Sequence, residues 1–174
     1  MKQLSEADLE HFQTHGWVKI PGCFTAEAAH SRTKDVWTRL GMSPTDKSTW
    51  GKGGRTNMPA LTHWSAKDFA PKAWSGICDL CGGEERVAPE AAQWGDGLIV
   101  NLGTDEGEGK MIEGNELNEW HVDGDFFVHY LDSQEQGLLV IPLFTEIEKG
   151  GGGTFLLPSG IRHVARHLVS LNLT

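Results

Sequence analysis

The sequence predicts one domain of the α+β class, with helices in its first half and short strands in its second. The 174 residues are enough for one hydrophobic core. Helix-capping signals come before residue 93, whereas short apolar runs between turn residues follow residue 94. The 22 glycines favour many tight turns over a helical bundle. We therefore expect a single domain over 1–174, mainly helix and loop in 1–93 and a β core in 94–174.

Helix signals open the chain. Ser5 can cap a helix whose first turn is acidic, and Gly16 would end that helix. Residues 17–20 are typical of a short strand. Thr25 is placed to cap a second helix, which we expect to run to about Leu40.

A loop and a third helix complete the first half. Residues 41–64 are rich in Gly, Pro, Ser and Thr, which predicts an extended loop. Within it, residues 51–55 hold three glycines but lack the spacing of a phosphate-binding loop, so a surface loop is favoured. A third helix is expected over 67–81, because Gly82 can end it.

Short apolar runs mark the second half. The β-branched run at 98–102 predicts a strand, and residues 103–118 form an acidic, glycine-rich segment typical of a loop. Three further runs, at 126–131, 137–144 and 154–157, predict a β-meander or part of a barrel.

Charge and composition limit the kinds of partner. With 15 Lys and Arg against 24 Asp and Glu, the formal net charge is −9, which disfavours nucleic acid and anionic membrane surfaces as partners. The polar N-terminus has no secretory or transit character, and no window is long enough for a membrane span. We expect a cytoplasmic protein.

The cysteines do not form a disulfide framework, because there are only three of them. Cys78 and Cys81 have the spacing of half a zinc site or of a redox pair, but no second Cys or His pair at matching spacing completes a zinc site. Ordinary thiols are the favoured interpretation. A zinc protein built on these two cysteines and a histidine is a further hypothesis.

The most informative segment contains His121 and Asp123. On an extended backbone, side chains two residues apart point to the same face, so an imidazole nitrogen and a carboxylate oxygen can bind one cation. This pair supplies two of the three ligands of a facial triad, which binds Fe(II) and leaves positions open. A calcium loop over Asp123, Gly124 and Asp125 is excluded, because its twelfth position would be Gln134.

Three motifs in order resemble the phytanoyl-CoA dioxygenase-like family of Fe(II)/2-oxoglutarate-dependent oxygenases, and its fungal-type members in particular. The first is the polar start at 4–8 followed by His15-Gly-Trp-Val-Lys-Ile-Pro-Gly-Cys-Phe24. The second is Trp120-His-Val-Asp-Gly124, similar to the H-x-D strand end of the family. The third is Gly150-Gly-Gly-Gly-Thr-Phe-Leu-Leu-Pro-Ser-Gly160, similar to its glycine-rich PGSH segment.

This resemblance implies a double-stranded β-helix (jelly-roll) core with N-terminal helices, and a dioxygenase (oxidoreductase) activity that hydroxylates a small organic substrate. Iron, as Fe(II), would be the cofactor and 2-oxoglutarate the cosubstrate, with His121 and Asp123 as metal ligands. Asn101 is a candidate for a cosubstrate contact, and an outward-facing polar side chain is the alternative interpretation.

The sequence departs from the family after residue 160. The family has a distal histidine as third ligand and, beyond it, an arginine for 2-oxoglutarate, whereas this chain ends at Thr174. His163 and His167 are one helical turn apart, which favours a helix face over a ligand strand. His129 is expected in a cross-strand structural role. We therefore expect a C-terminally truncated barrel without its last strands, and a chain that is inactive or impaired.

The alternative is a non-catalytic pseudoenzyme or interaction fragment. Strands without their closing partners leave an open β edge and an apolar interior, and such edges pair with other chains. This alternative predicts self-association through the unpaired β edge.

Overall fold

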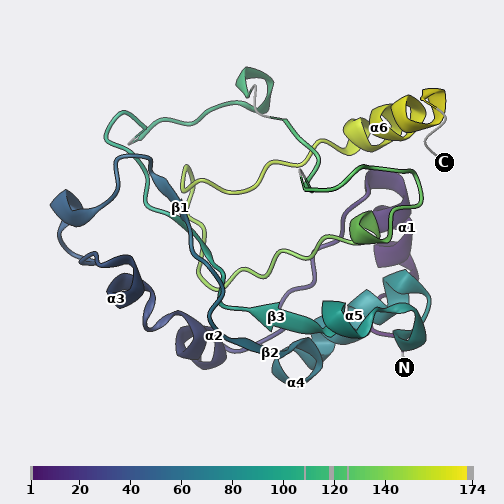
Figure 1. Ribbon diagram of the computed structural model, residues 1–174, viewed down its shortest axis with the longest axis horizontal. Coiled ribbons are helices and arrows are strands. Elements are labelled where there is room, and N and C mark those ends of the chain that lie inside the picture. Colours follow the sequence, from purple (N-terminus) through teal and green to yellow (C-terminus); the bar gives the residue numbers. More distant parts are fainter. Residues whose placement is uncertain (1, 108, 118–119, 125, 172–174) are drawn as a thin grey trace.

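The computed structural model describes residues 2–107, 109–117, 120–124 and 126–171, and it confirms the α+β class (Figure 1). The helices it describes are α1 (Glu6–His15), α2 (Ala26–Thr33), α3 (Val36–Leu40), α4 (Ala66–Phe69), α5 (Pro71–Cys81) and α6 (Pro158–Ser170). The strands are β1 (Arg55–Asn57), β2 (His63–Ser65), β3 (Gln93–Gly95) and β4 (Ile99–Asn101). Each described helix is too short or too polar to cross a membrane.

Helix α1 forms where its capping signals predict it. The Ser5 hydroxyl accepts a hydrogen bond from the Asp8 backbone N–H, and the Asp8 carboxylate accepts one from the Ser5 N–H, which completes a capping box. Gly16 ends the helix in the left-handed region at φ 76°. The Asp79 carboxylate of α5 accepts hydrogen bonds from the backbone N–H groups of Gln3 and Leu4, which fixes the N-terminus on α5.

The expected second helix is two helices. α2 ends at Thr33 and α3 begins at Val36, with Asp35 between them at φ −97° and ψ 4°. The Thr33 hydroxyl donates to the backbone carbonyls of the preceding turn, at Ala29 and His30. Side-chain bonds of this kind compete with the helical ladder and bend helices, which accounts for the break.

The expected third helix is also divided, at Ala70. Pro71 has no backbone N–H and disfavours the helical conformation of the residue before it, and Ala70 lies at φ −136°. Pro71 is nevertheless well suited to the first position of α5. Gly82 ends α5 at φ 83°, as the sequence predicts.

Two small antiparallel sheets join distant parts of the chain. β1 pairs with β4, Thr56 opposite Val100, and β2 pairs with β3, Trp64 opposite Trp94. The strand expected at 98–102 is therefore confirmed as β4. The purely loop interpretation of residues 41–64 is wrong, because β1 and the start of β2 lie inside that range.

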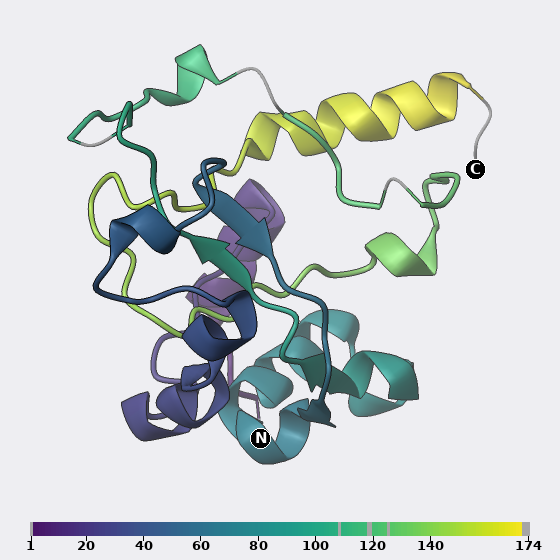
Figure 2. The same cartoon turned by 60° about the vertical axis from the view of Figure 1, so that its left-hand side comes forward.

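The predicted strands at 17–20, 126–131, 137–144 and 154–157 are not formed within the described residues. The last three segments run around the molecule before α6 without forming strands (Figures 1 and 2). Apolar alternation favours an extended backbone, but a strand also needs a neighbour for its hydrogen bonds. The described residues show no jelly-roll.

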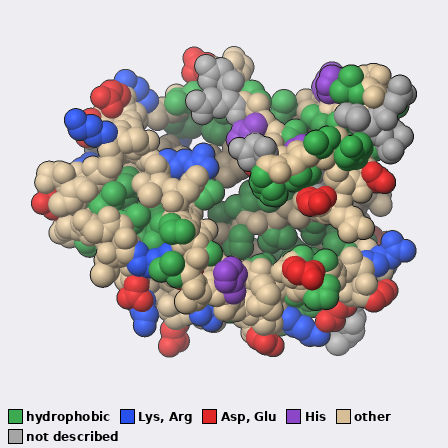
Figure 3. Space-filling model, viewed as in Figure 1, with side chains coloured by type: hydrophobic (Ala, Val, Ile, Leu, Met, Phe, Trp, Pro, Cys, Tyr) green, Lys and Arg blue, Asp and Glu red, His purple; other side chains and the backbone are tan. Residues whose placement is uncertain are grey.

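The buried core lies in the first half. Its central cluster is formed by Ala66, Trp74 and Ile77, which pack against partly buried side chains that include Trp94 and Leu138. In the described part of the chain, the buried apolar residues apart from Leu168 lie between positions 4 and 77. Of the exposed large apolar residues, all but Trp17 and Leu61 follow residue 98. The face in Figure 3 is hollowed near its centre, and hydrophobic side chains border the hollow.

Candidate functional site

His121 and Asp123 lie together on an exposed segment after the acidic loop. The His121 Nε2 and Asp123 Oδ1 atoms are 3.3 Å apart, and the side chains are 70% and 62% exposed. The intervening Val122 is exposed as well. The prediction that these two side chains share a face is confirmed, although no strand holds them.

The separation of these atoms fits a common cation. Two adjacent ligands of an octahedral ion, each about 2.1 Å from the metal, lie about 3.0 Å apart. A nitrogen and an oxygen at 3.3 Å need only a small adjustment to reach that arrangement. The donor set of one imidazole and one carboxylate therefore fits Fe(II) as a partial site.

Within the described residues, no third His, Cys, Asp or Glu joins this pair to form a metal-binding group. His163 and His167 lie exposed on α6, which confirms the helix interpretation of their spacing. The family resemblance implies a β-strand at this position instead of a helix. Pro158 occupies the first turn of α6, where its fixed φ favours helix initiation.

His129 belongs to a local turn beside the pair. Its Nε2 atom lies 2.6 Å from the Gly124 carbonyl oxygen, and its ring stacks on Phe127 with centroids 4.6 Å apart. The predicted cross-strand role of His129 is wrong, because no described strand passes there. Its contacts are nevertheless structural. Gly124 has a φ of 104°, and the Phe127 ring occupies the space that a Cβ would need. Asp125, part of the excluded calcium loop, lies outside the described residues.

Asn101 is the last residue of β4. Its side-chain amide donates a hydrogen bond of 3.0 Å to the Gly152 carbonyl. This contact attaches the glycine-rich segment to β4. The candidate cosubstrate contact therefore remains a proposal, and the structure adds a local role for this side chain.

The three cysteines are free thiols. Burial raises the pKa of the Cys23 thiol and that of the Cys78 thiol, which lowers their reactivity at neutral pH. Cys78 and Cys81 lie on α5, and in the described part of the chain no further donors join them in a metal-binding group. The zinc hypothesis gains no support from this geometry.

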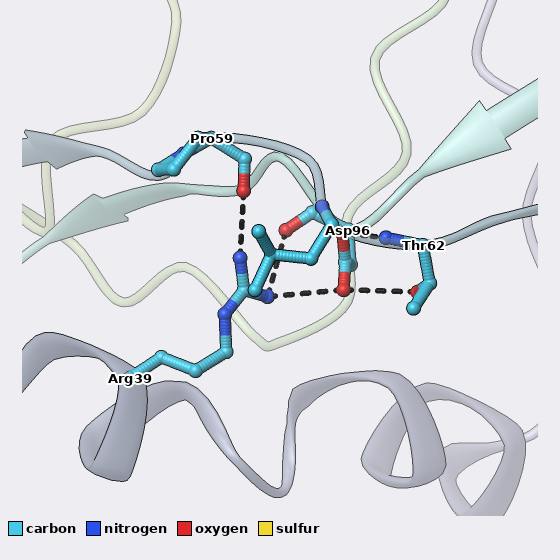
Figure 4. A network of polar contacts seen from close by, with 5 residues as sticks. Arg39, Pro59, Thr62 and Asp96 are labelled. Carbon is cyan, nitrogen blue, oxygen red and sulfur yellow. Dashed lines mark hydrogen bonds and ion pairs between the residues drawn. The ribbon is translucent and has the colours of Figure 1, made fainter.

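A polar network around Asp96 was missed by the sequence reasoning (Figure 4). The Asp96 carboxylate accepts hydrogen bonds from the backbone N–H groups of Leu61 and Thr62 and from the Thr62 hydroxyl. Arg39 of α3 lies 3.2 Å from the same carboxylate and donates to the carbonyls of Asp96 and Pro59. The only sequence signal was an aspartate between two glycines, which indicates a turn.

These contacts stabilise the charged form of Asp96. The backbone hydrogen bonds, together with Arg39, lower the pKa of this carboxyl to about 2. Partial desolvation acts in the opposite direction and raises the pKa, but its effect is smaller than that of the hydrogen bonds and Arg39 combined. The network holds α3, the loop before β2 and the end of β3 together. We interpret it as structural, because its contacts connect these segments to one another.

The chain matches no model of a known protein family, no curated protein and no solved structure.

Proposed function

We propose that the chain is a phytanoyl-CoA dioxygenase-like protein, a non-haem Fe(II)/2-oxoglutarate-dependent oxygenase of small organic substrates. The observation that carries this proposal is the 3.3 Å approach of His121 Nε2 and Asp123 Oδ1. The order of the three motifs supports it. The proposal includes a double-stranded β-helix in which the extended segments 137–144 and 154–157 pair as strands.

His121 and Asp123 would hold the metal, His121 through a neutral imidazole nitrogen and Asp123 through a charged oxygen. When bound, Fe(II) would supply the activation of O2, which is the oxidant: one oxygen atom is used in converting 2-oxoglutarate to succinate and CO2, and the other in hydroxylating the C–H bond. The turn made by Gly124, Phe127 and His129 fixes the backbone that follows the pair. Because the described residues add no third ligand, we expect these two side chains to bind metal weakly and without efficient turnover.

Metal binding is the direct test. Mn²⁺ substitutes for Fe(II) without oxidation, and its free form is measured by electron paramagnetic resonance. We expect saturable binding that His121→Ala and Asp123→Ala each weaken by about tenfold or more. His30→Ala, which removes an exposed histidine of α2, is the matched control and leaves binding unchanged. Equal binding by all four proteins contradicts the proposal.

Turnover is a separate readout. Succinate formed from 2-oxoglutarate in the presence of Fe(II) reports the oxygenase reaction, and a metal blank without protein gives its background. Succinate above that blank, abolished by His121→Ala, supports an active oxygenase. Metal binding without succinate formation supports the proposal that the chain binds metal but is catalytically impaired.

A second candidate, a non-catalytic interaction protein, is favoured by the accessible surface. The chain exposes 13050 Å². A compact monomer of 19.1 kDa exposes about 8,400 Å², so the chain has enough surplus surface to form a large permanent interface. We expect a sedimentation coefficient that rises with concentration. A monodisperse monomer across a hundredfold dilution excludes this candidate.

A further inference from the structure

Helix α6 is basic, although the chain as a whole is acidic. It contains no Asp or Glu, whereas the formal net charge of the chain is −9. Its basic face consists of exposed side chains within two turns, Arg162, His163, Arg166 and His167. Within the described residues, neither arginine side chain has an ion pair or a hydrogen bond. The positive charge of this face is therefore available to a partner.

Two exposed carboxylates of the acidic loop form an acidic pair, Glu113 and Glu116. Glu113 precedes a short 3-10 helix, Gly114–Glu116, and its backbone N–H donates a hydrogen bond to the Glu116 carboxylate. Residues three apart in a 3-10 helix are about 6 Å apart along the axis, as are residues four apart in an α-helix. The acidic pair therefore has nearly the same spacing as Arg162 and Arg166.

The acidic pair and the basic face lie on the same side of the molecule. The ring of Phe155, three residues before α6, is 3.7 Å from the position that a Cβ of Gly114 would occupy. The acidic loop and α6 follow the same upper edge of the molecule in both views (Figures 1 and 2). No ion pair between described residues connects the two groups within the chain.

This arrangement is complementary to itself. When opposite charges lie next to each other on one face, a two-fold axis between them places each charge opposite its complement on a second copy. A nucleic acid or an anionic membrane surface would satisfy the basic face but would repel the acidic pair. The charges of the chain therefore favour a second copy as the partner.

Exposed apolar side chains accompany both charged groups. Met111 and Ile112 precede the acidic pair, and residues 155–157 precede α6. These five side chains are between 48% and 56% exposed. Apolar side chains beside charged ones are typical of protein–protein interfaces, in which the charged groups lie at the rim.

We propose that this face binds a second copy of the chain about a two-fold axis, with the basic face of each copy on the acidic pair of the other. The inference rests on the interaction role proposed above and names its surface. It differs from pairing through a β edge, because it depends on charge and uses no strand.

Two double variants and their mixture test the proposal. Arg162→Glu with Arg166→Glu reverses the arginine charges of the basic face, and Glu113→Lys with Glu116→Lys makes the acidic pair positive. In sedimentation equilibrium at about 50 mM salt, each variant alone is expected to self-associate at least about tenfold more weakly than the wild type, because both contacts of the dimer become repulsive. An equimolar mixture of the two is expected to associate again, because each contact then joins opposite charges.

The matched control is Lys34→Glu with Arg86→Glu. It changes the net charge as much as the arginine variant does, at exposed positions after α2 and after α5, and is expected to associate like the wild type. Association in the mixture also shows that both variants are folded and that the contact forms between chains rather than within one.

The other outcomes separate this surface from the interaction role itself. Self-association that neither double variant weakens, or that the mixture does not restore, overturns this surface and leaves the interaction role standing. A wild type that stays monomeric across a hundredfold dilution overturns both. A monomer that instead sediments with vesicles of anionic phospholipid overturns the proposal and assigns the basic face to a membrane surface.

Discussion

Asp96 shows how one side chain can hold several segments together. Its carboxylate accepts two backbone N–H groups and one hydroxyl from the loop before β2 and lies beside the Arg39 guanidinium. Arg39 in turn reaches two backbone carbonyls. Because the partners in this network are 20 to 57 residues apart in the sequence, no local sequence pattern predicts their contacts.

We expect Asp96→Asn to lower the free energy of unfolding at pH 7 by about 1–2 kcal/mol, since hydrogen bonds to a charged acceptor are replaced by neutral ones. The folded-state pKa of about 2 is below the value of about 3.9 for an unfolded chain. This stabilisation is therefore complete above about pH 4 and is lost as the pH falls toward 2.

Urea denaturation at pH 7, 4 and 2.5 measures this effect. The difference between the wild type and Asp96→Asn is expected to shrink as the pH falls. Asp105→Asn, in the exposed acidic loop, is the control and follows the wild type throughout. A difference that stays constant with pH would show that the charge of Asp96 is not what stabilises the fold.

Gly124 is the second position where one residue decides local structure. Its φ of 104° is rarely adopted by other residues, and the Phe127 ring fills the place of a Cβ. Gly124→Ala is expected to distort the turn after Asp123 and to weaken Mn²⁺ binding by about fivefold or more. The melting temperature is expected to change little, because this segment is exposed. Unchanged Mn²⁺ affinity would contradict a role of the turn in positioning the pair.

At the scale of elements, an aromatic cluster connects the two halves of the chain. Phe144 stacks on Phe24 at 5.3 Å and contacts Phe69 at 6.1 Å and Trp64 at 6.5 Å. Phe69 also contacts Trp94 of β3. The cluster thus places the extended segment at 137–144 against α4 and the β2–β3 sheet, although this segment has no strand partner.

Phe144→Ala removes these aromatic contacts, so it is expected to lower the free energy of unfolding and to speed proteolysis of the second half. The expected loss is about 1–3 kcal/mol, less than for a fully buried ring, because Phe144 is only partly buried. Phe126→Ala is the matched control. The Phe126 side chain is 84% exposed, so its removal is expected to change the stability little. Equal effects of both substitutions would contradict the anchoring role of the cluster.

At the scale of the whole molecule, packing is uneven. The first half buries nearly the whole core, whereas the second half exposes most of its apolar side chains. Residues 138–147 donate no backbone hydrogen bonds to other described residues. Exposed apolar surface on this scale is typical of an interface.

Hydrogen exchange tests this division. Amides of α5 are expected to be protected, whereas those of 138–147 are expected to exchange at nearly unprotected rates in dilute protein unless 137–144 and 154–157 pair as strands of the proposed β-helix. If the second half forms an interface, protection of 138–147 is expected to rise with concentration. Strong protection of this segment in dilute protein would show that it pairs within the chain.

The local rules of the sequence accounted for helix ends and for one strand. The helix cap at Ser5, the stop at Gly82 and the strand in 98–102 are all confirmed. The spacing of His121 and Asp123 also predicted that the two side chains meet. These features depend on interactions between residues a few positions apart, so the local sequence is enough to predict them.

Other features were decided by the tertiary structure. The pairing of β1 with β4, the network of Asp96 and the aromatic contacts of Phe144 join residues far apart in the sequence. The apolar runs after residue 126 predicted strands, and the described residues there form none. An alternating pattern determines which conformation a segment favours, whereas a sheet, a core or a metal site forms only where a second segment supplies the missing hydrogen bonds, surface or ligand.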